Sequence, residues 1–352
     1  LIAAFSNVLS TVVKLIAILF LPKYPMLVLS QIFGAMTQTL IISVPALISN
    51  TWFLAQERTV FTALMSNCMN LGIGIGMVMP PLMINSANKD QAAFLKFFVV
   101  QAAWAGVALV AIIFGVPKRP KSSPSFAADA MADMEKIETI PSVKQLVRNR
   151  SFVLLALLSC AVMGVIWALS AVLPQVLLPF GVSESNTGWM GFSNMVSGSL
   201  VASIACYFIG KSGHLKGSLV VMGGLLASLT GLWLLLLHLH KDAAVAISFG
   251  CYILIGFVAN TTFPVIMELG IELTYPLSEE VSSTALLWLP VGSSVVLIQI
   301  MSAILGNNPD THQATMVIAL CLIVIVLGVL AMLFVVPVHR RQEYEIASAQ
   351  SE

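Results

Sequence analysis

The chain has 352 residues, of which 58% are hydrophobic and 9% are charged, and its formal net charge is +1. This composition is far more apolar than that of a soluble globular domain, and the near-neutral charge argues against a nucleic-acid partner. The five cysteines fall within apolar runs and show no CxxC spacing, so neither a disulfide framework nor a zinc site is expected.

Ten segments are long and apolar enough to cross a bilayer, which takes about 20 residues in a helix. Their residues do not alternate between apolar and polar as those of barrel strands do, so helical spans are predicted. The predicted spans are residues 1–21, 24–53, 59–84, 97–116, 152–179, 187–210, 218–238, 243–273, 281–305 and 313–336. The predicted fold class is therefore an all-α polytopic membrane protein.

One long polar stretch, residues 117–150, separates the first four spans from the last six. Its prolines and mixed charges are typical of a partly disordered linker, in which a short amphipathic helix is expected at residues 131–137. Placing this linker in the cytoplasm puts twelve of the 17 Lys and Arg residues on the cytoplasmic side and four on the other side. Because positive charges favour the cytoplasm, this orientation is predicted, together with a cytoplasmic tail at residues 339–352.

Two short segments of similar sequence indicate that the chain has two related halves. "QERTVFTAL" at residues 56–64 and "SEEVSSTAL" at residues 278–286 share a Glu and end in the same Thr-Ala-Leu. Each lies between the second and third spans of a six-span half if two helices are missing from the front, and such repeats are typical of transporters. The chain is therefore interpreted as an N-terminally truncated fragment, with helices 3–6 in residues 1–116 and helices 7–12 in residues 151–338.

Four of the 16 acidic residues are concentrated in "ELGIELTYPLSEEVSSTALLW", residues 268–288. They suit either a catalytic carboxylate cluster or proton relay, or a polar hinge between two buried helices. Glu268 and Glu272 are four residues apart and share one face at the end of a span, and the loop contains no His. A structural or gating role on the cytoplasmic side is therefore favoured. The predicted gating residues are Glu57, Arg58, Glu268, Glu272 and Glu279.

Polar and aromatic residues that share a face of membrane helices are expected to line a small-molecule pathway. The candidate substrate-binding residues are Gln38, Asn70, Trp167, Gln175 and Trp288. Amides such as Asn194 and Asn260 can instead form interhelical hydrogen bonds, and for any single amide this structural role is favoured. No carboxylate lies deep in the spans, so a cation is expected to meet an aromatic cage, and facilitated diffusion or exchange is favoured.

The glutamate segment resembles the E-x-x-x-E-x-T-Y-P-x-S-E-x-x-S-S stretch of the feline leukaemia virus subgroup C receptor-related family, within the major facilitator superfamily of solute carriers. "TWFLAQERTVFTAL" is similar to that family's W-F-x-x-x-E-R segment, and "NLGIGIGMVMPPLMI" to its glycine-rich fifth helix. "RNRSFVLLALLSCAVMGVIWALSAVLPQVLL" resembles its seventh helix. The resemblance implies the major facilitator fold, with ten of its twelve transmembrane helices, numbers 3–12, present.

The resemblance also implies transport of choline and ethanolamine, with haem or pyridoxine as alternative substrates. The implied aromatic site falls on Trp167, where the family commonly has Tyr, and its amide positions fall on Asn70 and Val291, where the family has Gln.

The expected protein is a monomeric multi-pass transporter that works by alternating access, in the plasma membrane or else in an organelle membrane. Its expected partners are the lipid bilayer and an organic cation or haem, without cofactor, metal or nucleic acid. Two other classes are considered, a non-transporting membrane receptor and a membrane enzyme. The enzyme is not favoured, because the sequence contains neither an H-E-x-x-H nor a Gly-x-Ser-x-Gly motif.

Overall fold

The computed structural model describes residues 1–20, 24–41, 55–84, 90–115, 139–274 and 279–336, together with Val44, Ile48 and Trp52. The described residues form helices, turns and bends, with no strand among them. Chain contacts divide the protein into two compact units, Leu1–Glu135 and Lys136–Glu352.

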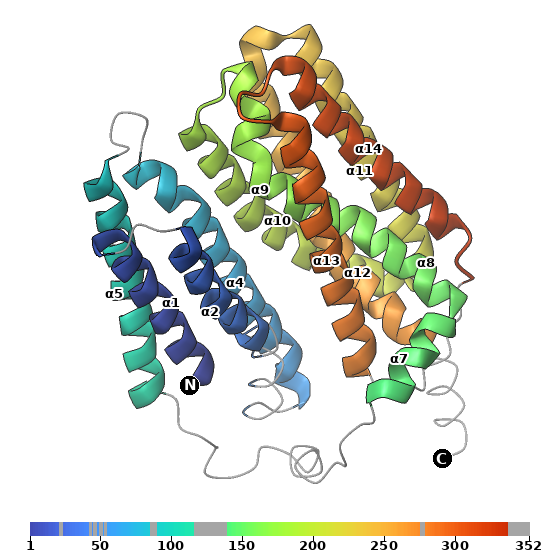
Figure 1. Ribbon diagram of the computed structural model, residues 1–352. Helices are drawn as coiled ribbons and strands as arrows, with labels where there is room; N and C mark the ends of the chain where they lie inside the picture. The colour runs from blue at the N-terminus through green and yellow to red at the C-terminus, as the bar shows by residue number, and fades with distance from the viewer. Residues whose placement is uncertain are drawn as a thin grey trace. The chain divides into compact units, whose positions relative to one another are not determined.

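The first unit contains four long helices. They are α1 (Ile2–Leu19), α2 (Tyr24–Ile41), α4 (Ala55–Met83) and α5 (Gln91–Gly115). α1 packs against both α2 and α5, and α4 also contacts α5 (Figure 1).

Polar side chains hold α1 against both of its neighbours. Ser6 Oγ donates a hydrogen bond to the carbonyl of Phe33 on α2 at 2.9 Å. Lys14 lies inside α1, with its Nζ 6.0 Å from the ring centroid of Phe98 on α5. The lysine charge therefore meets an aromatic face, which makes a cation within an apolar helix less costly.

The second unit begins with the short helix α7 (Thr139–Arg148) and continues with a rod of four consecutive segments. The rod consists of α8 (Arg150–Ser159), the π-helical turn η1 (Cys160–Gly164), α9 (Val165–Leu177) and the 3₁₀ turn η2 (Leu178–Phe180). It is followed by α10 (Glu184–Ser212), α11 (Leu215–Leu239), η3 (Lys241–Ala243), α12 (Ala244–Thr274), α13 (Glu279–Leu305) and α14 (Thr311–Leu333).

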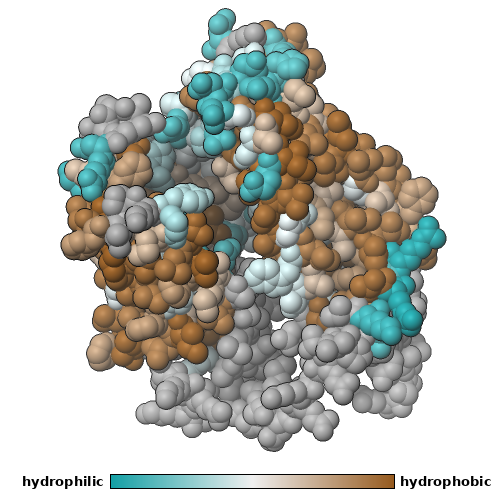
Figure 2. Space-filling model, in the orientation of Figure 1, coloured by the Kyte–Doolittle hydropathy of each residue, from teal (hydrophilic) through white to brown (hydrophobic). Residues whose placement is uncertain are grey.

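α12 lies at the centre of the packing in the second unit, since it contacts α8, α10, α11 and α13. α14 packs on α8 and α11, while α13 runs along η1 and α9 (Figure 1). Trp233 on α11 and Tyr252 on α12 are among the largest fully buried side chains. In this unit apolar residues cover the sides of the helices, and hydrophilic residues gather towards the helix ends (Figure 2). That distribution is the one a lipid bilayer requires.

Capping residues define the ends of several helices. Ser183 Oγ accepts a hydrogen bond from the backbone N–H of Asn186 at the start of α10. Asp310 and Gln313 form a reciprocal capping box at the start of α14, with bonds of 2.7 and 3.0 Å. Gly213 follows the last residue of α10 and caps the helix with a φ of 68°, which glycine adopts readily.

Helices occupy all ten predicted spans, and eight of the described helical segments are long and apolar enough to cross a membrane. The exceptions are α2, which is described only as far as Ile41, and α4, several of whose side chains lie outside the described part of the chain. The predicted all-α membrane fold is confirmed. The helix expected at residues 131–137 lies outside the described residues, whereas α7, which comes after it in the chain, was not predicted.

Candidate functional site

Two aromatic rings from different helices meet within the second unit. Trp167 on α9 is half-buried, and its ring centroid lies 6.4 Å from that of Phe263 on α12, with 60° between the ring planes. In this edge-to-face arrangement the two rings do not stack face to face on each other. Phe263 was not predicted from the sequence, although it stands three residues after Asn260 and directly before Pro264.

The π-helical turn η1 precedes Trp167 in the same rod. Ser293 on α13 donates through Oγ towards the carbonyl of Cys160 at 3.3 Å and to that of Pro290 at 2.9 Å. A Cβ atom at Gly164 would collide with the Ser293 side chain, so a glycine is needed for this close approach of α13. A π turn contains one extra residue and rotates the next helical segment by about 100°, so it sets the direction of Trp167.

A buried tyrosine ties α9 to its neighbours. The Tyr252 hydroxyl lies 2.8 Å from Oγ of Ser170, one turn beyond Trp167. The Tyr252 carbonyl accepts a hydrogen bond from Nδ2 of Asn194 on α10 at 2.7 Å. The Tyr252 ring also lies 6.2 Å, between centroids, from that of Trp233 on α11. The backbone that carries Trp167 is therefore held by contacts that involve α10, α11 and α12.

The other predicted binding residues of the second unit are more exposed. Gln175 is exposed on α9, and Trp288 is 40% exposed on α13. Among the described residues, no hydrogen bond or ring contact joins either side chain to Trp167. Asn260 donates to the carbonyl of Gly256 in its own helix at 2.9 Å, which is not the interhelical bond expected for single amides, whereas the bond from Asn194 to Tyr252 does join two helices.

The predicted binding residues of the first unit lie on two helices. Gln38 is exposed on α2, and Asn70 is half-buried on α4, where it takes part in an interaction. Gln38 and Asn70 belong to the first compact unit and Trp167 to the second, so a common site that joins them stays a prediction.

The two glutamates at the end of α12 have different surroundings. Glu268 is exposed and lines a cavity of about 310 Å³, whereas Glu272 is only 2% exposed, and both take part in interactions. The remaining residues that line the cavity are Cys206, Ile209, Gly210, Gly213, Leu215, Pro264 and Val265. Pro264 and Val265 directly follow Phe263, so α12 connects the aromatic pair with the cavity.

The other predicted gating residues lie at the starts of two helices. Glu57 and Arg58 are in the first turn of α4, and Glu279 is the first residue of α13; their side chains lie outside the described residues. Close to Glu279, Thr274 Oγ1 and Ser282 Oγ form a buried hydrogen bond of 2.6 Å between α12 and α13. This bond joins the two helices across the loop that was predicted to be a hinge.

The groups around Trp167 are aromatic and hydroxyl-bearing. They consist of two rings and the hydroxyls of Ser170 and Tyr252. Across the described residues there is no group of three or more His, Cys, Asp or Glu side chains that is able to hold a metal ion. An aromatic face with nearby hydroxyl groups is suited to an organic cation.

Comparison with known proteins finds relatives of similar sequence among membrane transporters. The human choline/ethanolamine transporter FLVCR2 is 27% identical over 269 residues, which cover 74% of this chain and 50% of the relative. The solute carrier family 49 member 4 homolog of Xenopus tropicalis is 28% identical over 254 residues, covering 67% of this chain and 54% of the relative. The chain thus spans about half the length of these curated relatives.

Two solved structures share the fold at low sequence identity. A bacterial homologue of the iron transporter ferroportin, in an outward-facing state, has a TM-score of 0.57 and 14% identity, covering 94% of this chain and 81% of the other. The fucose:proton symporter FucP of E. coli has a TM-score of 0.56 and 12% identity, covering 94% and 82%. Residues 2–276 match the profile of the Major Facilitator Superfamily. The chain therefore belongs to the Major Facilitator Superfamily.

Proposed function

We propose that the protein is a transmembrane transporter that moves choline- or ethanolamine-like organic cations by alternating access. The observation that carries this proposal is the pair of Trp167 and Phe263, two rings contributed by different helices of one six-helix unit. The relatives named as choline/ethanolamine transporters support the substrate class.

An aromatic pair suits this substrate for a physical reason. A quaternary ammonium group has no N–H donor, so a polar site offers it little, whereas the electron-rich face of a ring attracts it directly. The attraction is worth about 2 kcal/mol or more when the site is shielded from water. Ser170, which is one helical turn beyond Trp167, and its hydrogen-bond partner Tyr252 add two hydroxyl groups to this region.

The route of the cation is proposed to continue along α12. Glu268 is five residues beyond Phe263, which corresponds to about 7.5 Å along a helix axis, and its carboxylate borders the cavity. The Glu268 carboxylate is proposed to attract the cation after it has left the rings. Glu57, Arg58, Glu272 and Glu279 are proposed to act with Glu268 as the gate.

The remaining sequence-based expectations belong to this proposal. The protein is proposed to be a monomer without enzymatic activity, in the plasma membrane, with Gln38, Asn70, Gln175 and Trp288 contributing to the substrate pathway. Residues 1–116 and 151–338 are proposed as its two helical halves, with residues 117–150 as the cytoplasmic linker and 339–352 as the cytoplasmic tail.

The test is uptake of radiolabelled choline into cells that express the protein, with ethanolamine and haem as competitors. Trp167→Ala should reduce choline uptake at least tenfold, since a shielded cation–π contact is lost, while Trp167→Tyr should retain most of it. Trp104→Leu is the matched control, because Trp104 is 67% exposed on α5.

Two results would overturn the proposal. Absence of choline uptake by protein that is folded and present at the cell surface would exclude choline as a substrate, and competition by haem alone would favour haem. Full activity of Trp167→Ala would remove the aromatic pair from the site.

A further inference from the structure

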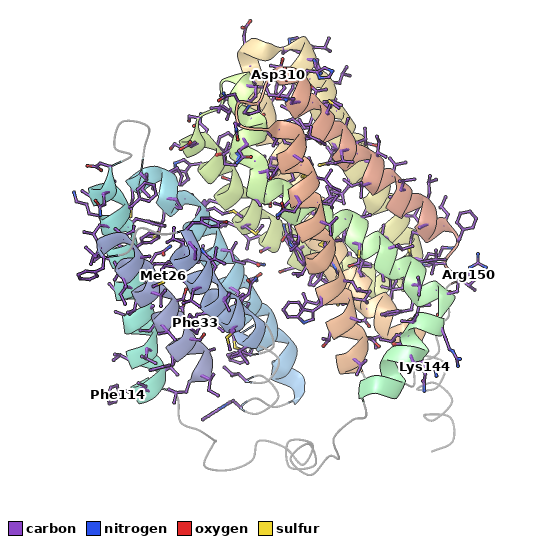
Figure 3. The ribbon with its side chains drawn as sticks, viewed as in Figure 1. Met26, Phe33, Phe114, Lys144, Arg150 and Asp310 are labelled. Atoms are coloured by element: carbon purple, nitrogen blue, oxygen red, sulfur yellow. The ribbon has the colours of Figure 1, made fainter. Side chains whose placement is uncertain are left out.

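Three cations lie close together in sequence where α7 meets α8. Lys144, Arg148 and Arg150 are all exposed, and none forms a hydrogen bond or ion pair through its side chain with the described part of the chain. Lys144 and Arg148 are four residues apart on α7, so they share one face of that helix. Figure 3 shows Lys144 and Arg150 pointing away from the helices that carry them. The cluster therefore carries about three positive charges without a counter-ion among the described residues.

α7 has the character of a helix that lies at a membrane surface. Leu146 is only 2% exposed, because α7 packs against α8 and α13, whereas the neighbouring Val147 is 70% exposed. Apolar and basic side chains thus emerge together from one short helix. This combination is typical of helices that lie in the headgroup region of a bilayer.

An apolar surface continues directly from the cations. Val153 and Leu157 follow Arg150 at three and seven residues on α8, and they are 37% and 52% exposed. Phe334, just after α14, is 69% exposed, and the nearby Val336 N–H donates to Ser151 Oγ at 3.3 Å. This hydrogen bond joins the start of α8 to the segment that follows α14, and apolar side chains are exposed on both. Figure 2 shows a hydrophilic patch at the lower right that borders apolar surface.

We propose that this basic cluster and the apolar stripe beside it bind an anionic phospholipid of the cytoplasmic leaflet. The cations match the phosphate and additional negative charge of the headgroup, and Val153 and Leu157 lie where its acyl chain would run. A phospholipid can place its headgroup at the cations while its acyl chains stay beside the apolar side of α8, whereas a soluble anion could use the cations alone. The two features together thus favour a lipid.

Lipid binding at the basic cluster would also stabilise the contact between α8 and the end of α12. Asn149 stands between Arg148 and Arg150, and its Oδ1 accepts from the N–H of Phe152 at the start of α8. Its Nδ2 donates to the carbonyl of Leu273, near the end of α12, at 2.8 Å. A headgroup held by both arginines would therefore stabilise the junction of α8 with α12, the helix that carries Phe263.

The first experiment locates the lipid. The protein is placed in phosphatidylcholine vesicles that contain a small fraction of phosphatidylserine with a diazirine group in its acyl chain, irradiated, and mapped by peptide mass spectrometry. Labelling should concentrate on residues 153–157 and 334–336, and diazirine phosphatidylcholine should label them at least fivefold less. Equal labelling by the two lipids, or labelling elsewhere only, would overturn the proposal.

The second experiment tests the cations. Each basic residue near an anionic surface contributes about a fivefold gain in binding, so loss of all three should weaken binding roughly 100-fold. The triple variant Lys144→Gln, Arg148→Gln, Arg150→Gln should therefore lower phosphatidylserine labelling to the level of phosphatidylcholine labelling. Lys211→Gln, which changes an exposed lysine at the end of α10, should have no effect.

The triple variant Lys144→Arg, Arg148→Lys, Arg150→Lys keeps the charge, and it should retain the labelling. This variant distinguishes loss of charge from loss of folding. Undiminished labelling in the glutamine variant would refute the role of the cations. Glycerophosphoserine, the soluble headgroup, should compete only weakly, and full displacement by it would show that the site binds a free anion instead. These measurements are independent of transport, so they stand or fall separately from the proposed substrate.

Discussion

Phe263 combines a defined ring contact with a side chain that has few other ways to interact. Its ring pairs with that of Trp167 on a neighbouring helix, and it lies next to the proline that interrupts the backbone bonding of α12. A phenylalanine ring has no polar atom that needs a hydrogen bond, so its specific interactions are with another aromatic ring or a cation. A single substitution can therefore test whether Phe263 contributes to transport.

Phe263→Leu should raise the KM for choline uptake about three- to tenfold, because the aromatic face is lost while an apolar side chain of similar size is kept. Phe263→Tyr should leave the KM within about twofold of that of the unchanged protein. The measurement is the concentration dependence of initial choline uptake. Phe208→Leu, at a residue that is 64% exposed on α10, serves as the control. A KM that stays the same in Phe263→Leu would show that Phe263 does not contact the substrate.

At the scale of the helices, α10 and α12 of the second unit approach each other closely. A Cβ atom at Gly256 would meet the side chain of Asn194, which is 1% exposed and already bonded to the carbonyl of Tyr252. On the facing helix α10, a Cβ atom added to Gly198 would lie 3.0 Å from the carbonyl oxygen of Gly256. Glycines on both helices thus allow the backbones to approach and hold the amide in place.

Gly256→Ala should lower the free energy of unfolding by about 1–3 kcal/mol, since the added methyl group displaces a buried, hydrogen-bonded amide. Gly250→Ala changes the same helix at a position with open space around it, and it should be neutral or slightly stabilising. Thermal unfolding of the purified variants in one detergent measures the difference. Equal melting temperatures for Gly256→Ala and Gly250→Ala would contradict the proposed close contact.

The helices could be predicted because each depends on a local property, a run of about 20 apolar residues. Their ends differ from the predicted ends by a few residues where a polar cap such as Ser183 or Asp310 begins the helix earlier. The pairing of Trp167 with Phe263 could not be predicted, because it depends on the tertiary arrangement of α9 and α12. The π turn before Trp167 had no local signal either, since it is held in place by Ser293 of α13.

For the whole molecule, the arrangement of functional groups along α12 matters most. This single helix carries Phe263 at the aromatic pair, Glu268 at the cavity and Glu272 at a buried position near its end. Movement of this helix would therefore affect the proposed substrate site and the proposed gate together. Alternating access requires such coupling, because the site must not open to both sides at once.

Glu272→Gln should lower the maximal rate of choline transport several-fold while it leaves the affinity for choline nearly unchanged. A carboxylate that is 2% exposed depends strongly on its partners, so removal of its charge shifts the balance between the two access states without touching the rings. Uptake kinetics give the rate, and equilibrium binding of radiolabelled choline gives the affinity. Asp242→Asn, at an exposed carboxylate of η3, controls for a general loss of charge. An unchanged maximal rate would count against gating by Glu272, whereas a loss of binding would place Glu272 in the substrate site itself.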